Sequence, residues 1–459
     1  MNKTLRISSA AAGAGSGATA ECQNGRVGGE APGVLCHSGI AKRLRSARFL
    51  GTHLRTNCLL VFACLLVGAP AQAPTFEVVL RSGEVLRATA PAGSAPVSGD
   101  WPGPLAVATA EGVRRVASAE VLALLGCPGA ALELPVVTLA GGEQLCGSLV
   151  GGDAQGERFT VHSPALGPQS FPVDRLAALA GPGPDRDRVA ALVLPRGVDE
   201  ALVRRVPLGF DWLSGTLHRF GSEGIRFQTK GEDSPRWFAV ADVLGLRLGA
   251  AAARATPPAA WLCTRTGDRL GVQVEAFDAR GLRCRLETDE QVLVHTGDVA
   301  SVVFLGAHTF ASDLQPSEVA ESGHDGDVLW PWRRDQAATG GWLVAAGRTY
   351  AKGLGVHSRS RLVFRAPAGS AAFWTRVAFD DSAAALPVQG RVDVRISVDG
   401  KLRFEHRDLQ VGRALLDPGL LPVTPGATVA LEVECGKGRD LGDRIDWLLP
   451  VFLPAAESR

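Results

Sequence analysis

The sequence has a single methionine and a single tyrosine, and its 459 residues carry a formal net charge of only +1. Nucleic-acid binding through bulk electrostatics needs a clear excess of positive charge, so the composition argues against that function. No CxxC pair occurs, which argues against a structural zinc site. Long helical periodicities are also absent, whereas glycine (55) and proline (28) are plentiful. This composition is typical of an all-β protein with many turns.

Cysteine gives no complete disulfide framework. Nine cysteines occur in the chain, and an odd number of them follows the predicted leader described below. Cys263 and Cys284 lie on neighbouring strand-like segments. They either form one bridge in an oxidising compartment or serve as small buried hydrophobic residues.

Residues 1–73 have the order of an export leader. A basic cluster is followed by the apolar run 58–67 and then by small residues, and cleavage after Ala71 fits the small-residue rule. The basic cluster lies far from Met1, which predicts an internal start near residues 44–54. The apolar run is shorter than the ~20 residues that span a bilayer, and no later segment is a transmembrane candidate. We therefore expect a protein that is secreted or that lies in the periplasm or cell envelope.

A second feature is a pattern that recurs about four times before residue 307. Each copy holds short strand-like runs, a Gly-Asp or Gly-Glu hairpin turn, and an acidic residue near its end, which valine follows in three of the four copies. A length of about 45 residues predicts small, strongly bent antiparallel barrels that resemble SH3 or Sm barrels and pack on one another. No copy combines a nucleophile with a base, so we expect no enzyme activity. The predicted repeats are 74–126, 134–181, 204–249 and 259–306.

Residues 307–456 have a different texture, with dense aromatic residues and an Asp-Gly hairpin signal at Asp399. Strand-like runs recur at a spacing typical of an antiparallel β-sandwich. The predicted strands are 362–365, 373–379, 392–398, 402–406, 428–434 and 447–452.

An ordered set of motifs marks this region. Its centre is the nonapeptide 350–358, Tyr-Ala-Lys-Gly-Leu-Gly-Val-His-Ser, in which Gly353 and Gly355 predict a bulge or a close backbone approach. The set resembles the signature of the NPCBM family of carbohydrate-binding modules. The resemblance implies a jelly-roll sandwich of the galactose-binding type that binds glycans without catalysis. The other motifs are 312–314, 334–335, 377–381, 398–401 and 443–447.

Candidate ligand-binding residues follow from the chemistry of sugars. Sugars offer apolar C–H faces to aromatic rings and hydroxyls to forked polar groups. We expect no metal or other cofactor to be required, although a structural Ca²⁺ is one alternative for the aspartates. The predicted carbohydrate-binding residues are Trp332, His357, Asp380, Asp381, Arg444, Asp446 and Trp447.

Structural alternatives stand beside these roles. Trp447 is either a stacking platform or a core residue, and His357 is either a ligand or a buried histidine that bonds the glycine-rich turn. Asp380 and Asp381 either bind sugar, cap a turn or hold a structural Ca²⁺. Because adjacent residues of a strand point to opposite faces, these two carboxylates cannot flank one glycosidic bond.

Two positions depart from the family signature: Arg444 stands where we expect histidine, and Leu448 stands where we expect a small residue. The leader and the motif set predict an exported, non-catalytic protein that binds a polysaccharide or glycoconjugate. The alternative is a structural or scaffold protein of the cell envelope, in which the sandwich contacts protein without binding sugar. The departures favour the alternative, whereas the aromatic residues of 330–380 favour sugar binding. In either case the repeats offer surfaces for protein partners.

Overall fold

The computed structural model describes residues 75–455 apart from 90–93, 130–131, 184–199, 207–208, 250, 253, 255, 324–329 and 438. The predicted all-β class is confirmed, because every helix that the structure describes is a short 3-10 turn. None of these turns is long and apolar enough to cross a membrane. The predicted leader lies outside the described residues.

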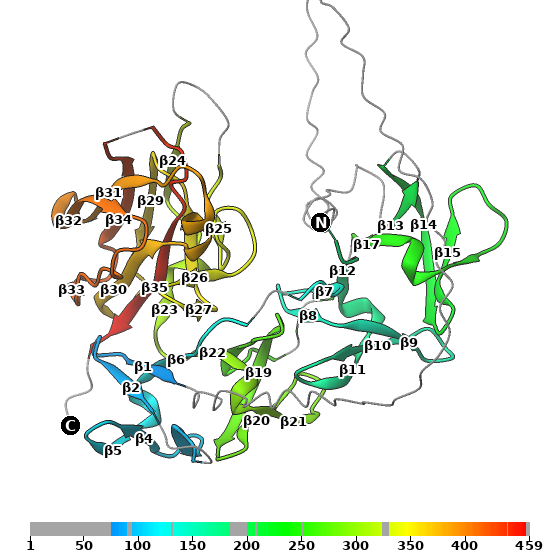
Figure 1. Cartoon of the computed structure of the whole chain (residues 1–459), viewed down its shortest axis with the longest axis horizontal. Helices are drawn as coiled ribbons and strands as arrows, with labels where there is room; N and C mark the ends of the chain where they lie inside the picture. Colours follow the sequence, from blue (N-terminus) through cyan, green and yellow to red (C-terminus); the bar gives the residue numbers. More distant parts are fainter. Residues whose placement is uncertain are drawn as a thin grey trace, which may run out of the picture. The chain divides into compact units, whose positions relative to one another are not determined.

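The strands before residue 305 form four groups along the chain, in each of which the last strand pairs with the first; the predicted division into repeats stays a prediction (Figure 1). The third group begins at Glu200, before the predicted boundary at residue 204. The first two groups comprise β1 (Phe76–Leu80), β2 (Val85–Ala88), β3 (Val97–Asp100), β4 (Leu105–Thr109), β5 (Gly112–Val116) and β6 (Val121–Leu125), then β7 (Val136–Leu139), β8 (Gln144–Cys146), β9 (Ser148–Gly152), β10 (Arg158–Ser163), β11 (Gly167–Pro172) and β12 (Leu176–Ala180). The last two comprise β13 (Glu200–Val206), β14 (Gly209–Gly221), β15 (Gly224–Thr229), β16 (Arg236–Phe238) and β17 (Val243–Leu248), then β18 (Ala260–Thr264), β19 (Arg269–Phe277), β20 (Gly281–Arg285), β21 (Gln291–His295) and β22 (Val299–Phe304).

The acidic segment near the end of each copy forms a 3-10 turn. The last strand of each group follows this turn directly and pairs antiparallel with the first strand of the same group. The shared topology explains why the acidic pattern recurs, whereas the resemblance to SH3 and Sm barrels stays a prediction. The turns are η1 (Ser118–Glu120), η2 (Val173–Arg175), η3 (Val240–Asp242) and η4 (Thr296–Asp298).

The four groups associate in two pairs. In each pair the last strands of the two groups are hydrogen-bonded to each other, and the register is the same in both pairs. In the first and fourth groups β6 pairs antiparallel with β22, and Leu124 lies opposite Val302. In the second and third groups β12 pairs antiparallel with β17, and Leu179 lies opposite Leu246. Each of these residues is the fourth of its strand, so the two pairs repeat the same pseudo-twofold arrangement.

The hairpin-turn carboxylates tie the second group to the fourth. Asp268 accepts hydrogen bonds from the Ser163 hydroxyl at 2.8 Å and from the Cys146 amide at 2.9 Å. Reciprocally, Glu143 accepts from the Gly271 amide at 3.0 Å and pairs with Arg175 at 2.9 Å. Burial raises the pKa of both carboxyls. These turns therefore position two groups against each other, a role that their sequence does not reveal.

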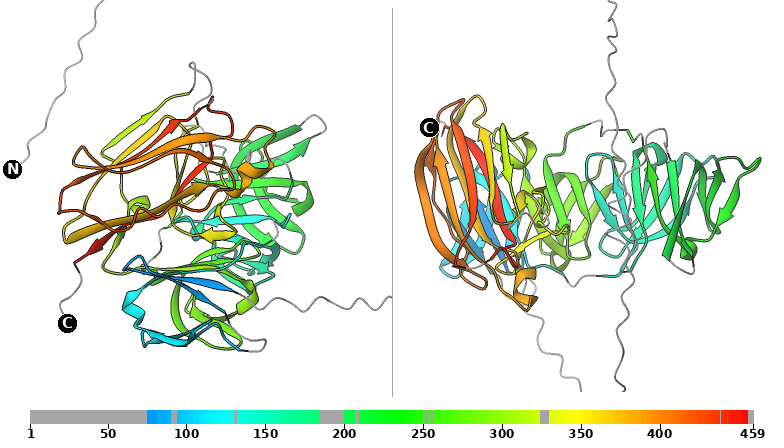
Figure 2. Two further views of the ribbon diagram at one scale, coloured as in Figure 1. Left: turned by 60° about the vertical axis from the view of Figure 1, so that its left-hand side comes forward. Right: turned by 90° about the horizontal axis from the view of Figure 1, so that it is seen from above.

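The C-terminal region is a sandwich of two antiparallel sheets, as predicted (Figure 2). In the first sheet the order is β25-β28-β35-β30-β33, with β23 beside β35; in the second it is β24-β29-β34-β31-β32. The short hairpin β26–β27 stands apart from both sheets. The first sheet and the hairpin comprise β23 (Thr309–Phe310), β25 (Arg333–Arg334), β26 (Leu343–Ala345), β27 (Arg348–Tyr350), β28 (Gly353–Val356), β30 (Ser370–Phe379), β33 (Leu421–Pro422) and β35 (Ile445–Pro454). The second comprises β24 (Glu318–Glu321), β29 (Ser360–Arg365), β31 (Arg391–Val398), β32 (Lys401–Gln410) and β34 (Thr428–Cys435).

Local sequence signals in the sandwich behave as expected. Asp399 and Gly400 adopt φ angles of 49° and 72° in the β31–β32 hairpin. The predicted close approach at the nonapeptide is confirmed, because a Cβ atom at Gly355 would lie 2.3 Å from the Gln336 carbonyl oxygen. No larger residue fits there without a shift of the 336–338 loop, so the motif glycine is a packing requirement.

The outer face of the first sheet is buried against the repeats. Leu448, Val451 and Trp374 join one apolar cluster with Leu122 of β6 and Val303 of β22. The leucine at position 448 is therefore explained by its neighbours, because a small residue would leave this cluster underpacked.

The two paired-cysteine candidates are both free. Cys263 lies in the same apolar cluster as Leu448, and Cys284 lies in the core of the repeats. Burial raises the pKa of each thiol to about 12. The bridge that the sequence left open is not formed, and both residues serve as small buried hydrophobic groups.

Candidate functional site

An aromatic pair, one ring exposed and the other half-buried, lies where strands of the first sheet end. The ring of His357, which follows β28, stacks on the ring of Trp330 with centroids 5.9 Å apart and an interplanar angle of 18°. Trp330 precedes β25 and is 42% exposed. A flat ring that remains open to solvent is the type of surface on which the C–H face of a sugar packs.

Two polar side chains complete this surface, which we call the His357 site (Trp330, His357, Ser382 and Arg444). Arg444 lies just before β35, and its Nη1 donates to the Ser382 hydroxyl at 3.0 Å. The Arg444 guanidinium has five N–H donors in all, so it can also donate to a ligand. Burial lowers the pKa of His357; the negative charge of Asp440 opposes this shift, and the positive charge of Arg444 adds to it. The imidazole is therefore neutral near pH 7 and can both donate and accept a hydrogen bond.

A buried carboxylate holds the loops beneath the site together. Asp443 Oδ1 accepts from the Arg391 amide at 3.0 Å, and the nearby Ser358 hydroxyl favours the ionised carboxylate. Burial raises the pKa of Asp443 to about 6 in spite of these interactions. A Cβ atom at Gly390 would lie 2.3 Å from Asp443 Oδ1. The segment that carries Arg444 is thus fixed to the start of β31.

The predicted aspartates at 380 and 381 accept hydrogen bonds from the backbone. Asp380 accepts from the Ser382 amide at 3.0 Å and from the Val344 amide at 3.2 Å. Asp381 accepts from the amides of Ala346 at 3.0 Å and Gly347 at 2.8 Å. Asp380 therefore caps the 381–385 turn, which is the capping alternative, and both carboxylates anchor the β26–β27 hairpin. Within the described ranges, no group of acidic, histidine or cysteine side chains is arranged to hold a metal.

The remaining predicted residues lie away from the open surface. Trp447 and Asp446 are fully buried, and Trp447 packs in the core between the two sheets. Trp332 packs against the same core while the Arg334 guanidinium lies over its ring at 5.2 Å. Among the predicted residues, the structure therefore brings together His357 and Arg444. Trp447 is a core residue, which is the structural alternative to a stacking platform.

Sequence reasoning missed Trp330 and Ser382. Trp330 was visible only as one aromatic residue among many, and Ser382 follows the Asp-Asp motif without any signal of its own. Both reach the site because loops from different strands meet at one end of the sandwich. Periodicity within single strands carries no information about such a meeting.

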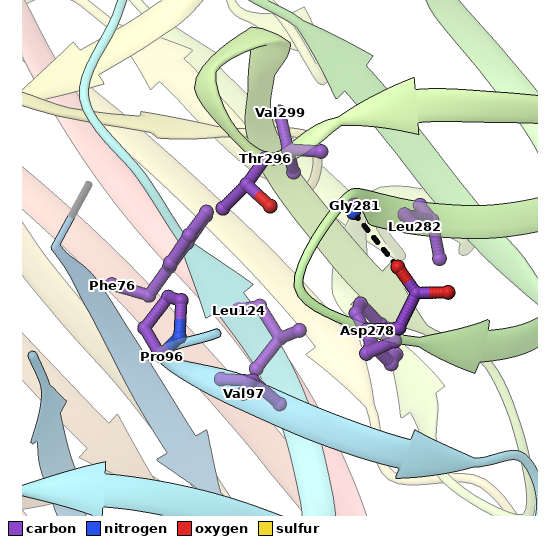
Figure 3. A pocket seen from close by; sticks show the side chains of 10 residues that line it. Phe76, Pro96, Val97, Leu124, Asp278, Gly281, Leu282, Thr296 and Val299 are labelled. Atoms are coloured by element: carbon purple, nitrogen blue, oxygen red, sulfur yellow. Dashed lines mark hydrogen bonds between the residues drawn. The ribbon is translucent and has the colours of Figure 1, made fainter. Parts of the chain in front are cut away.

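A small pocket between the first and fourth groups does not fit a sugar. Its one carboxylate, Asp278, accepts from the Gly281 amide of its own turn at 3.2 Å (Figure 3). Such a lining lacks the convergent polar groups that orient a sugar. The pocket is otherwise lined mainly by apolar groups, among them Phe76, Pro96, Val97, Leu124, Leu282 and Val299.

Comparison with known families identifies the C-terminal region. Residues 307–453 match the model of the NPCBM/NEW2 domain, so the predicted resemblance of this third of the chain is confirmed. No protein of curated function matches the chain.

Three solved structures are similar to parts of the chain. CBM51 from Clostridium perfringens GH95 in complex with methyl-galactose shares 16% identity over 32% of this chain and 100% of its own length, with a TM-score of 0.28. CBM51-2 with GlcNAc and INT domains from Clostridium perfringens ZmpB shares 20% identity over 51% of this chain and 44% of its own, with a TM-score of 0.29. The tandem CBM51 modules of Sp3GH98 from Streptococcus pneumoniae share 11% identity over 83% of this chain and 88% of their own, with a TM-score of 0.28. Scores this low leave the function of this chain to be argued from its own residues.

Proposed function

We propose that the protein is an exported, non-catalytic carbohydrate-binding protein whose NPCBM/NEW2 domain binds a polysaccharide or glycoconjugate at the His357 site. The observation that carries this proposal is the solvent-open Trp330 ring stacked on His357 beside Arg444. An aromatic face next to forked polar donors is the combination that sugars require. The leader supports export as a prediction from the sequence.

The binding mode follows from the chemistry of each group. The Trp330 face packs against the C–H face of one sugar ring, which gains apolar burial. Neutral His357 and the Ser382 hydroxyl exchange hydrogen bonds with sugar hydroxyls, and Arg444 donates to vicinal oxygens. Asp443 and the Asp380 cap hold these groups before the ligand arrives, which reduces the entropy lost on binding.

The absence of catalysis is supported by the carboxylates of this region. A glycosidase needs an acid and a base or nucleophile on either side of the scissile bond. Asp380 and Asp381 hold backbone amides, and Asp446 is fully buried. Asp380 and Asp446 are buried, and both oxygens of the exposed Asp381 already accept backbone amides.

A glycan array probed with the full mature chain tests the proposal. Trp330→Ala removes the stacking face, so binding to any glycan that the wild type recognises should weaken at least about tenfold. Trp212→Ala is the matched control, because Trp212 on β14 is 41% exposed and Trp330 is 42% exposed. Equal binding by both variants would place the ligand elsewhere.

A scaffold role is the second candidate, and one observation favours it. One sheet face of the sandwich packs on the repeats of the same chain, in the apolar cluster with Leu122 and Val303, so its fold can present a face that contacts protein. If the folded wild type binds no glycan on the array, the domain is better described as a protein-binding element of the cell envelope.

A further inference from the structure

A carboxyl group lies sealed beneath the candidate site. Asp446 is the second residue of β35, opposite Gly355 of β28 and Ala378 of β30. Its chain neighbours Ile445 and Trp447 both face the core between the sheets, so the Asp446 side chain points to the other face of the sheet. Its side chain is nevertheless fully buried.

No donor in the described part of the chain hydrogen-bonds to either oxygen of Asp446. The polar group that faces it is the carboxyl of Asp380 at the end of β30, and Asp381 of the following turn adds a second negative charge. β28 and β26 contribute no titratable side chain. Asp335, from the loop after β25, is occupied by Lys352 at 3.0 Å and Arg269 at 2.9 Å.

An ionised carboxylate in this place would be buried without any compensating partner, which strongly disfavours the charged form. A cation does not supply the compensation among the described residues, because they form no group arranged to hold a metal. Two carboxyls in contact that cannot both ionise share a proton instead.

We propose that Asp446 keeps its proton in the folded protein and donates it to Asp380, so that the two buried carboxyls carry one negative charge between them. This charge accepts the amide protons of Val344 and Ser382, while the Asp380 amide donates to the Arg444 carbonyl at 3.0 Å. The shared proton thus fixes the β26–β27 hairpin and the segment that carries Arg444. Loss of the proton at alkaline pH places a second charge in the pair and weakens these bonds.

The direction of the pH effect follows from linkage. Burial raises the pKa of Asp446 well above its usual value, whereas the unfolded chain ionises near pH 3.9. Below about pH 4 both states hold the proton and the pair has no effect on stability. Above that pH the unfolded state releases its proton first, so the unfolding equilibrium constant rises by up to about tenfold per pH unit until the folded pair also ionises.

The test is the thermal midpoint of the full chain at pH 5 and pH 8. Asp446→Asn keeps the shape and a donor to Asp380 but cannot ionise, so its midpoint should rise relative to wild type as the pH rises. Other groups, including Asp443, titrate equally in both proteins and cancel in the difference. Glu434→Gln on β34, an exposed carboxylate, is the matched control and should show the same difference from wild type at both pH values. A pH-independent difference for Asp446→Asn would overturn the proposal.

A second measurement does not depend on the variant folding. Infrared spectroscopy at pH 8 should show the carbonyl band of a buried protonated carboxyl group in the wild-type chain, and the band should persist in Glu143→Gln and Asp268→Asn, which remove two other carboxyls whose pKa burial raises. Lack of this band would overturn the proposal, as would a thermal midpoint that rises with added Ca²⁺ and falls with chelator, because a cation would then neutralise the pair. Neither measurement requires that the domain bind sugar.

Discussion

The two outer faces of the sandwich have opposite chemistry. On the five-stranded sheet, Arg361 and Arg395 alternate with acidic residues across the strands: Arg361 pairs with Glu432 at 2.7 Å and Arg395 with Glu405 at 2.8 Å. On the other sheet, Leu448 and Trp374 are buried against the repeats. The charged face is adapted to water and the apolar face to a fixed protein neighbour. One β-sandwich thus has a charged face that is exposed to water, which we call the wet face (Arg361, Arg395, Glu405 and Glu432). Its opposite face is apolar and buried against the repeats, and we call it the dry face (Trp374, Leu448 and Val451).

The strand sequences record this difference. β34 alternates apolar with polar residues, as a half-buried strand does, whereas every residue of β35 but its last is buried. A run that is buried on both faces indicates that a strand is covered on both sides. The docked face therefore makes the C-terminal domain part of a larger packed unit with the repeats.

Truncation within the dry face should have the largest effect. Leu448→Ala leaves a cavity between the sandwich and the repeats, and we expect a loss of about 2–5 kcal/mol in the free energy of unfolding. Urea unfolding of the full chain measures it. Leu402→Ala on β32 is the control, because Leu402 is 54% exposed and its truncation should change stability by no more than about 0.5 kcal/mol. Similar losses for both variants would show that the repeats do not cover this face in solution.

Breaking an ion pair at the border of the dry face should reduce the free energy of unfolding by less than Leu448→Ala does. Lys352 is 2% exposed and pairs with Asp335, which also binds Arg269. A broken buried ion pair typically costs about 3–5 kcal/mol of unfolding free energy. Lys352→Met should cost less than this, because Arg269 still neutralises Asp335. Urea unfolding of the double variant with Asp335→Asn completes a mutant cycle. A coupling energy near zero would contradict the buried pair.

Much of the fold was predictable because local patterns carry it. The six predicted strands of the sandwich, the hairpin at Asp399 and the close approach at Gly355 all follow from alternation or from glycine geometry. The acidic pattern of the repeats also predicted a recurring feature, although not that it forms a 3-10 turn. Each of these signals lies within a few consecutive residues, so the sequence alone reveals them.

The candidate site was predictable only in part, because it depends on contacts between distant segments. His357 and Arg444 carry chemistry that the motif makes visible, whereas Trp330 becomes relevant only where its loop meets β28. Whether Trp447 faced solvent or the core depended on which face of β35 meets the second sheet. Leu448 is explained only by repeats located more than a hundred residues earlier in the chain.

The smallest change in unfolding free energy is expected for a substitution on the wet face, and its small size would sharpen the difference between the two faces. Glu432 lies between Arg361 and Arg395, and its side chain is 24% exposed while that of Arg361 is 37% exposed. Because water and salt screen such pairs, Glu432→Gln should cost at most about 1 kcal/mol of unfolding free energy. The loss should shrink further in urea unfolding at 1 M salt, where the screening length falls to about 3 Å. A salt-independent loss as large as that of Leu448→Ala would mean that this face is also covered, and the difference between the two faces would no longer hold.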